Sequence, residues 1–144
     1  MTNSTDDTGA PTAPRVKLSS LRADEALERN GDWKDAIGIP GVSFKVRSIN
    51  YPPYTIARDF LMQRLRRKAG GKPIKQDVLL PELGRLYAEH ILLDWKGFDE
   101  AYTPELAMKT LTDPQYRELV SAIESLASQV GESEIEFIED TIKN

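Results

Sequence analysis

The sequence contains no cysteine and only one histidine among its 144 residues. The lack of cysteine excludes disulfide bonds, thiolate catalysis and cysteine-ligated zinc. No stretch approaches the roughly 20 apolar residues of a membrane-spanning helix, so the sequence predicts no membrane partner. Residues 1–15 carry two Asp and no apolar run, a composition typical of neither a signal peptide nor a transit peptide. We therefore expect a cytoplasmic protein.

Net positive charge is also lacking, because 23 acidic residues outweigh 19 basic ones and give a net charge of -4. Nonspecific binding to nucleic acid requires a positive surface. The negative net charge therefore argues against nucleic-acid binding as the main activity. The one basic cluster, Arg64 to Lys68, leaves a small nucleic-acid-binding regulator as an alternative, although such cations also complement the C-terminal dipole of a helix. The acidic C-terminal half opposes this cluster in charge, a polarity that suits head-to-tail self-association or a charged partner.

The chain has the length of one domain. Residues 1–14 are rich in Thr, Asp, Ala and Pro, so we predict a disordered tail there and a single helical domain over residues 15–144. Within this domain, the apolar residues Val42, Phe44 and Val46 alternate with polar ones, which predicts a strand and a β-hairpin near residues 33–48. Two strands alone are marginal in water, so the hairpin must lie on helices or on another chain.

Helical periodicity dominates the remainder of the sequence. The apolar spacing predicts helices over residues 20–30, 54–68 and 77–94, two more after Thr103-Pro104 and Asp113-Pro114, and an acidic terminal helix over residues 132–144. In each Thr-Pro or Asp-Pro pair, the first residue can cap a helix and the proline fits its first turn. The predicted fold class is mainly α, a bundle of about five short helices with a small N-terminal β-hairpin.

Catalytic patterns are scarce. His90 and Asp94 are four residues apart on a predicted helix, but two ligands make a weak metal site, and a polar residue at the edge of an apolar helix face is usually solvated. The Gly70-Gly71-Lys72 segment lacks the earlier glycine and the following Ser or Thr of a phosphate-binding loop. No G-x-S-x-G motif is present. The sequence therefore predicts no enzyme, no metal and no cofactor.

The order of these signals resembles the small tail assembly chaperones of long-tailed bacteriophages. The matching residues span roughly Leu18 to Val130: Phe44 to Ser48, Tyr54, Asp94, Trp95, Gly97, Phe98, Tyr102 to Ala107, Leu111 to Pro114 and Tyr116 to Leu119. The resemblance implies a mostly helical, non-enzymatic protein that keeps the tape measure protein soluble and helps to recruit the major tail protein. It also implies a location in the cytoplasm of the infected host and absence from the mature virion.

Large aromatic residues dominate interface energies, which makes Trp95, Phe98 and Tyr102 candidate partner-binding anchors. An equally supported interpretation makes Trp95 a core residue at a helix end. Phe137, which lies off the apolar stripe of the terminal helix, is a candidate exposed contact, and the basic residues Arg64, Arg66 and Arg67 are candidate contacts for a charged partner. A structural virion component, such as a connector or minor tail protein, remains an alternative function.

Overall fold

The computed structural model describes residues 13–138, which fall into two compact units. The larger unit covers Asp24–Glu132, and the described residues 13–23 and 133–138 belong to a second, terminal unit. Of the predicted disordered tail over residues 1–14, all but Ala13 and Pro14 lies outside the described residues. None of the helices in residues 13–138 combines the length and apolar composition needed to cross a membrane.

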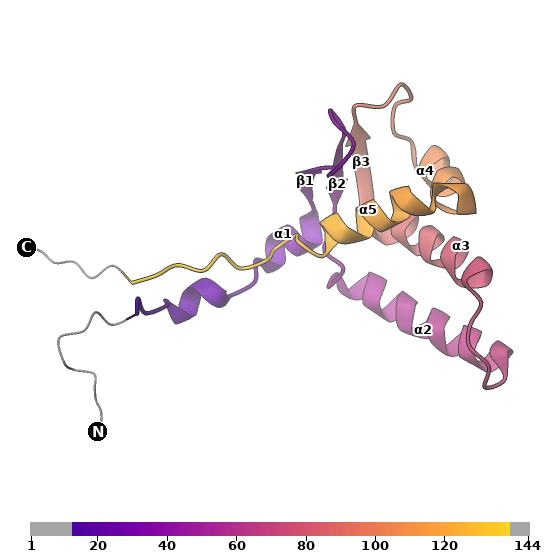
Figure 1. The fold of residues 1–144 in the computed structure, drawn as a ribbon, viewed down its shortest axis with the longest axis horizontal. Coiled ribbons are helices and arrows are strands. Elements are labelled where there is room, and N and C mark those ends of the chain that lie inside the picture. Colours follow the sequence, from indigo (N-terminus) through magenta and orange to yellow (C-terminus); the bar gives the residue numbers. More distant parts are fainter. Residues whose placement is uncertain (1–12, 139–144) are drawn as a thin grey trace, which may run out of the picture. The chain divides into compact units, whose positions relative to one another are not determined.

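The larger unit is built around a three-stranded antiparallel sheet (Figure 1). Its strands are β1 (Asp32–Asp35), β2 (Ser43–Val46) and β3 (Leu92–Lys96), in the spatial order β1-β2-β3. The alternation of apolar and polar residues places Phe44 and Val46 of the central strand in the core, where both are fully buried. The β1–β2 pair matches the hairpin predicted near residues 33–48 to within two residues at either end, but β3 extends it into a sheet that the sequence did not predict.

The prediction of a mainly α bundle is wrong, because the chain has a mixed α/β fold. The helix predicted over residues 77–94 is in fact α3 (Gln76–Leu86), a π-helical turn η2 (Tyr87–Ile91) and strand β3. A β-bulge interrupts the pairing of β3 with β2: Lys45 pairs with Asp94 and Val46 with Leu92, so Leu93 opposes no residue. The bulge lets Leu92 and Trp95 both be buried although they are three residues apart, a spacing that normally indicates a helix.

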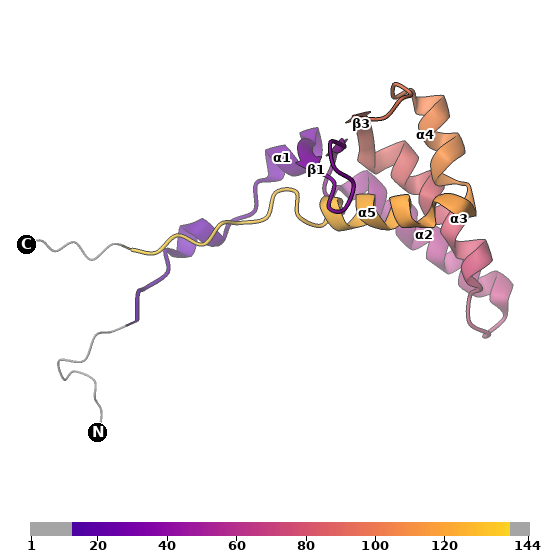
Figure 2. The same ribbon diagram turned by 45° about the horizontal axis from the view of Figure 1, so that its top comes forward.

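The remaining helices of the larger unit are α1 (Glu25–Asn30), α2 (Pro52–Ala69), α4 (Pro104–Leu111) and α5 (Arg117–Ala127). As predicted, Thr103 caps α4: its hydroxyl oxygen accepts the backbone N–H of Leu106 at 3.0 Å. Asp113 instead caps a single 3-10 turn, η3 (Pro114–Tyr116), which leads into α5. Figure 2 shows α4 beside α3, where Gly84 allows the two backbones to approach closely.

The hydrophobic core joins the sheet to these helices. Its buried side chains include Phe44 and Val46 of β2, Tyr54, Leu61 and Leu65 of α2, Leu86, Tyr87 and Ile91 before β3, Leu92 and Trp95 of β3, Ala107 and Leu111 of α4, and Val120, Ile123, Leu126 and Ala127 of α5. Most of the apolar residues whose spacing predicts the helices α2 and α5 therefore face the core, but Tyr116, just before α5, is 48% exposed. Phe60 of α2 is also exposed, at 68%.

The terminal unit brings together two segments from opposite ends of the sequence. Val16 and Phe137 form an antiparallel bridge, and a 3-10 turn, η1 (Leu18–Leu21), follows Val16. The helix predicted over residues 132–144 is wrong over residues 132–138, which contain no helix, and its remaining residues lie outside the described part. The acidic and apolar residues from Glu134 to Phe137 alternate with a period of two, a strand signal that the spacing of the isoleucines obscured.

Candidate functional site

A groove opens between α2 and α3 where the two helices are joined. Its apolar floor is formed by Leu65 and Ala69 of α2, Pro73 and Ile74 of the connection, and Val78 of α3, and its volume is about 340 Å³. Leu65 is a core residue, whereas Val78 keeps 46% of its surface exposed. We refer to this feature as the α2–α3 groove. It provides an apolar surface that a partner side chain can reach.

Two glycines create the sharp connection that forms one wall of the groove. Gly70 ends α2 in the left-handed conformation with a φ of 59°, and Gly71 follows with a φ of 86°. Residues with a Cβ rarely adopt such positive φ values, so the Gly-Gly pair lets the chain reverse within a few residues. The segment that fails as a phosphate-binding loop therefore has a structural role in returning α3 along α2.

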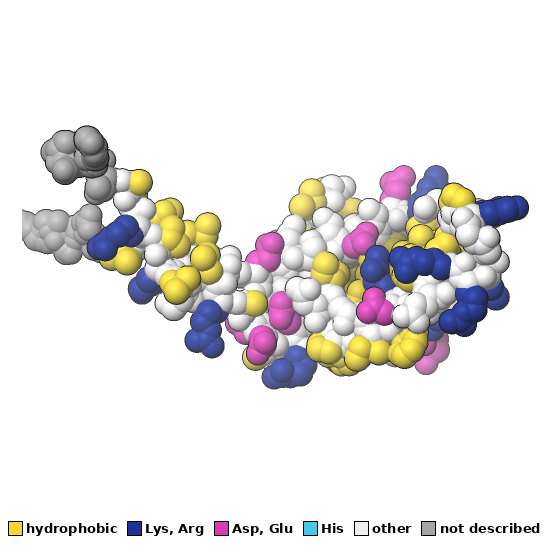
Figure 3. Space-filling view, turned by 90° about the horizontal axis from the view of Figure 1, so that it is seen from below, with side chains coloured by type: hydrophobic (Ala, Val, Ile, Leu, Met, Phe, Trp, Pro, Cys, Tyr) yellow, Lys and Arg dark blue, Asp and Glu magenta, His cyan; other side chains and the backbone are white. Residues whose placement is uncertain are grey.

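Basic side chains surround the apolar floor. We call the exposed lysines Lys68, Lys72 and Lys75, which line the groove, the basic rim; Arg66 and Arg67 are exposed in the same last turn of α2 but do not line it. Figure 3 shows Lys and Arg side chains gathered on the right-hand side of that view. Within residues 13–138, no member of the basic rim has an acidic side chain within ion-pair distance. The groove therefore combines an apolar floor with uncompensated positive charge.

Arg64 differs from the other two predicted arginines because it is already paired. Its guanidinium group lies 3.5 Å from the carboxylate of Glu82 on α3, and Arg85 contacts the same carboxylate at 3.1 Å. These ion pairs are partly exposed, so each contributes at most about 1 kcal/mol to stability. Arg64 thus helps to hold α2 and α3 together, while Arg66 and Arg67 remain available to a partner.

The predicted aromatic residues form a cluster against β3. Trp95 is buried, its ring lies 5.4 Å from those of both Phe98 and Tyr102, and its indole N–H donates to the backbone oxygen of Glu100 at 2.8 Å. Tyr102 is half-buried, and Phe98 is 37% exposed. These contacts pack the loop between β3 and α4 against the sheet. This arrangement agrees with the interpretation of Trp95 as a core residue. Only Phe98 has substantial surface left for a partner.

The predicted site residues lie on different elements. Trp95, Phe98 and Tyr102 lie at β3 and the loop that follows it, the three arginines lie at the end of α2, and Phe137 belongs to the terminal unit, where it is 57% exposed. Sequence analysis missed the floor of the groove. The available signal was Ile74 and Val78, two apolar residues four apart at the start of a helix and flanked by lysines.

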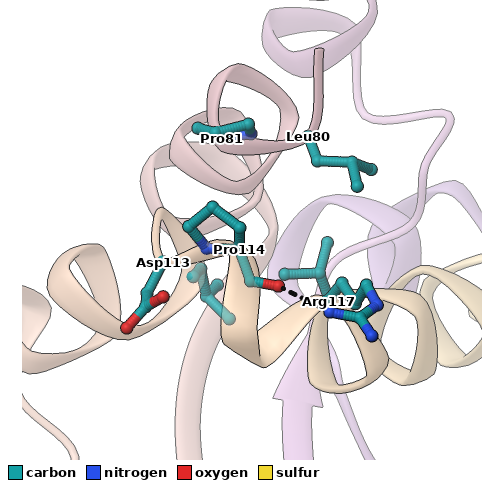
Figure 4. Close-up of a pocket in the computed structure, with 7 residues that line it drawn as sticks. Leu80, Pro81, Asp113, Pro114 and Arg117 are labelled. Carbon is teal, nitrogen blue, oxygen red and sulfur yellow. Dashed lines mark hydrogen bonds between the residues drawn. The ribbon is translucent and has the colours of Figure 1, made fainter. Parts of the chain in front are cut away.

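A second cavity, between α3, η3 and α5, is too small for a ligand. It is lined by Leu80, Pro81, Asp113, Pro114 and Arg117 with two core residues, and its volume is about 10 Å³ (Figure 4). A cavity of this size holds about one water molecule. In Figure 4 the guanidinium group of Arg117 donates to the backbone oxygen of Pro114 at 3.4 Å. This space is a packing gap between helices.

A larger depression lies where α1 approaches the start of α2, but its lining is more polar. Its volume is about 430 Å³, and Glu25, Glu28, Arg29 and Asn50 contribute to its walls. Part of this lining is already hydrogen-bonded, since Asn50 donates to Glu28 at 3.4 Å. The α2–α3 groove is therefore the better apolar binding surface.

Titratable groups in the core are tyrosines. Burial raises the pKa of Tyr87, and the neighbouring Tyr54 and Glu124 raise it further. Burial also raises the pKa of Tyr54. The rings of the two tyrosines are stacked, with their centroids 5.4 Å apart. Burial also raises the pKa of Tyr102, with smaller contributions from Asp94 and Glu105.

His90 is half-buried on η2. No three His, Asp or Glu side chains are grouped for metal binding in the described range, 13–138.

Comparison with known proteins gives one result. A family model described as YdaY prophage protein matches residues 49–144, a range that includes α2, α3 and the groove but not the β1–β2 hairpin. No curated protein and no solved structure matches the chain. The family match indicates a phage-derived protein.

Proposed function

The chain belongs to the YdaY prophage protein family, and from this premise we propose that it is a tail assembly chaperone that binds the tape measure protein. The proposed activity is binding, without catalysis and without a cofactor. The observation that supports it best is the α2–α3 groove, with its apolar floor and basic rim. In this proposal, the protein also helps to recruit the major tail protein, acts in the cytoplasm of the infected host and is absent from the mature virion.

The shape and charge of the groove suit one face of an amphipathic helix. Such helices bind in apolar grooves through residues at positions i, i+3, i+4 and i+7. The open floor around Ile74 and Val78 can accept one or two of these side chains, while Lys68, Lys72 and Lys75 can contact carboxylates that flank them. We therefore expect the bound segment of the tape measure protein to contain an apolar stripe bordered by Asp or Glu.

A nucleic-acid-binding regulator is the competing function, because the basic rim is also a suitable surface for phosphates. Proteins that bind single strands usually add aromatic side chains on which bases stack. The residues that line the groove are aliphatic and basic, with no aromatic residue among them. The chemistry of the floor therefore favours an apolar side chain over a base.

Co-expression with the tape measure protein of the same prophage tests the proposed function. The wild-type chain should increase the soluble fraction of this partner and co-purify with it. Val78→Asp places a carboxylate on the exposed edge of the floor and should weaken binding about tenfold, because this carboxylate would lose its water against the apolar stripe of the partner and repel the acidic residues that border it. Ile56→Asp is the matched control, because Ile56 is 56% exposed on α2 and does not line the groove.

Two results would reject this proposal. In the first, the partner remains insoluble with the wild-type chain, or Val78→Asp and Ile56→Asp solubilise it equally well. In the second, the chain binds DNA or RNA with an affinity that falls steeply with salt, which would favour the regulator. The virion-component alternative predicts the chain in purified mature particles, where the chaperone should be missing.

A further inference from the structure

The terminal unit has an unusual exposure of apolar side chains. Val16, Leu21, Phe137 and Ile138 are 40–57% exposed, Ile135 is 59% exposed, and Leu18 is 84% exposed. The two paired segments contribute one short bridge, and an isolated two-stranded pair is only marginally stable in water. Among residues 13–23 and 133–138, this unit thus offers apolar surface that a further partner can cover.

The hydrogen bonds of the bridge show where such a partner can attach. The backbone N–H of Lys17 donates to the oxygen of Glu136, and that of Ile138 donates to the oxygen of Arg15, both at 2.7 Å. These bonds flank the Val16–Phe137 pair, so the N–H and C=O groups of these two residues point away from each other, toward the two open edges. Among the described residues, none of these four groups has a backbone partner. Both edges are thus templates for adding a strand.

We propose that a second copy of this chain covers these edges, with the Val16 edge of one copy paired to the Phe137 edge of the next. The outward groups of Val16 and Phe137 are the two pairs of donors and acceptors that a hydrogen-bonded antiparallel pair exchanges. With Val16 opposite Phe137 of the neighbouring copy, Lys17 again lies opposite Glu136, as it does within the chain, where their side chains are 3.4 Å apart. The contact between copies therefore sets the same residues opposite each other as within one copy, but it uses the outward backbone groups of Val16 and Phe137.

Charge selects this arrangement over symmetric ones. Residues 13–23 carry Arg15, Lys17 and Arg22 and no acid, whereas residues 133–138 carry Glu134 and Glu136 and no base. Pairing two Val16 edges would set Arg15 against Lys17 twice, and like charges opposite each other destabilise a strand pair. Pairing two Phe137 edges would bring two acidic segments together. Joining a basic edge to an acidic edge avoids both costs and gives a head-to-tail contact.

Proline substitutions at the two edge residues test the proposal. The N–H groups of Val16 and Phe137 take no part in the bridge within one chain, so Val16→Pro and Phe137→Pro each remove an outward donor and keep the inward bonds. Analytical ultracentrifugation of the wild-type chain should show association beyond the 16.2 kDa monomer as concentration rises. Each proline variant alone should raise the dissociation constant by up to about tenfold, the loss expected for one hydrogen bond of up to about 1.4 kcal/mol.

Complementation makes the test specific for a head-to-tail contact. Val16→Pro leaves the Phe137 edge intact and Phe137→Pro leaves the Val16 edge intact, so an equimolar mixture should form a mixed dimer and stop at that size. Val16→Ala keeps the outward N–H and should associate more tightly than Val16→Pro. Circular dichroism checks that all variants retain the fold of the larger unit. A monomeric wild-type chain, a proline variant that associates like wild type, or a mixture that stays monomeric would each overturn the proposal.

Discussion

Replacing Gly84 by Ala should destabilise the protein, although Ala is the better helix former. Gly84 is buried in α3, and a Cβ atom there would overlap the backbone oxygen of Leu111 and lie 2.6 Å from its carbonyl carbon. No rotamer change can relieve a contact with backbone atoms, so α3 and the end of α4 must separate. Overpacking of this kind typically costs about 1–3 kcal/mol, and the gain in helix propensity offsets about 1 kcal/mol at most. Because the overlap is with rigid backbone, we expect the upper end of this range and a net loss of about 2 kcal/mol.

Urea unfolding followed by circular dichroism measures this loss. Gly84→Ala should lower the midpoint while leaving the slope unchanged, because a change in stability alone does not alter the surface exposed on unfolding. Gln63→Ala, at an exposed position of α2, is the matched control and should stay within about 0.5 kcal/mol of wild type. A Gly84→Ala protein as stable as wild type, or more stable, would show that α3 and α4 are not packed backbone to backbone.

Two further predictions concern the cap of α4 and the buried tyrosines. Thr103→Ala removes the acceptor of the Leu106 N–H and should lower the free energy of unfolding by about 1 kcal/mol. Thr103→Ser keeps a hydroxyl acceptor and should retain most of this stability. Equal urea midpoints for the two variants would contradict the capping role of Thr103. Burial raises the pKa of Tyr87 above that of an unfolded tyrosine, near 10, so above this pH the unfolded chain loses a proton that the folded chain retains and stability falls. Urea unfolding between about pH 9 and 11 should therefore show a steeper decline for wild type than for Tyr87→Phe, by up to about 1.4 kcal/mol per pH unit, and identical slopes would refute the assignment.

The sequence predicts those elements whose local pattern is typical of only one kind of structure. The period-two pattern around Phe44 located the hairpin, and Thr103-Pro104 located the start of α4. Strand β3 could not be found this way, because its bulge at Leu93 is set by pairing with β2 and not by local preference. Leu93 also shows what the bulge achieves: its side chain reaches Gly31, where an added Cβ would lie 2.6 Å from it.

The candidate site was predictable only in its charges. Exposed arginines at the end of α2 follow from helix periodicity, which places Leu61 and Leu65 inward and Arg66 and Arg67 outward. The apolar floor requires that α3 return along α2 after Gly71, and no local pattern fixes how closely two helices approach. The burial of Trp95 was likewise undecided, because a large aromatic residue after an apolar helix suits a core position and an interface equally well.

The family region, residues 49–144, depends on residues 1–48 for part of its sheet and core. The match begins at residue 49, after β2, yet β2 is the central strand that pairs with β3. A chain without residues 1–48 would leave β3 with no neighbour and would remove Phe44 and Val46, both fully buried, from the core beside Tyr87 and Ile91. It would also remove Val16 and so leave Phe137 without its bridge partner. Residues before the match therefore complete both the sheet of the larger unit and the bridge of the terminal unit, and any binding test of this protein has to use the full chain.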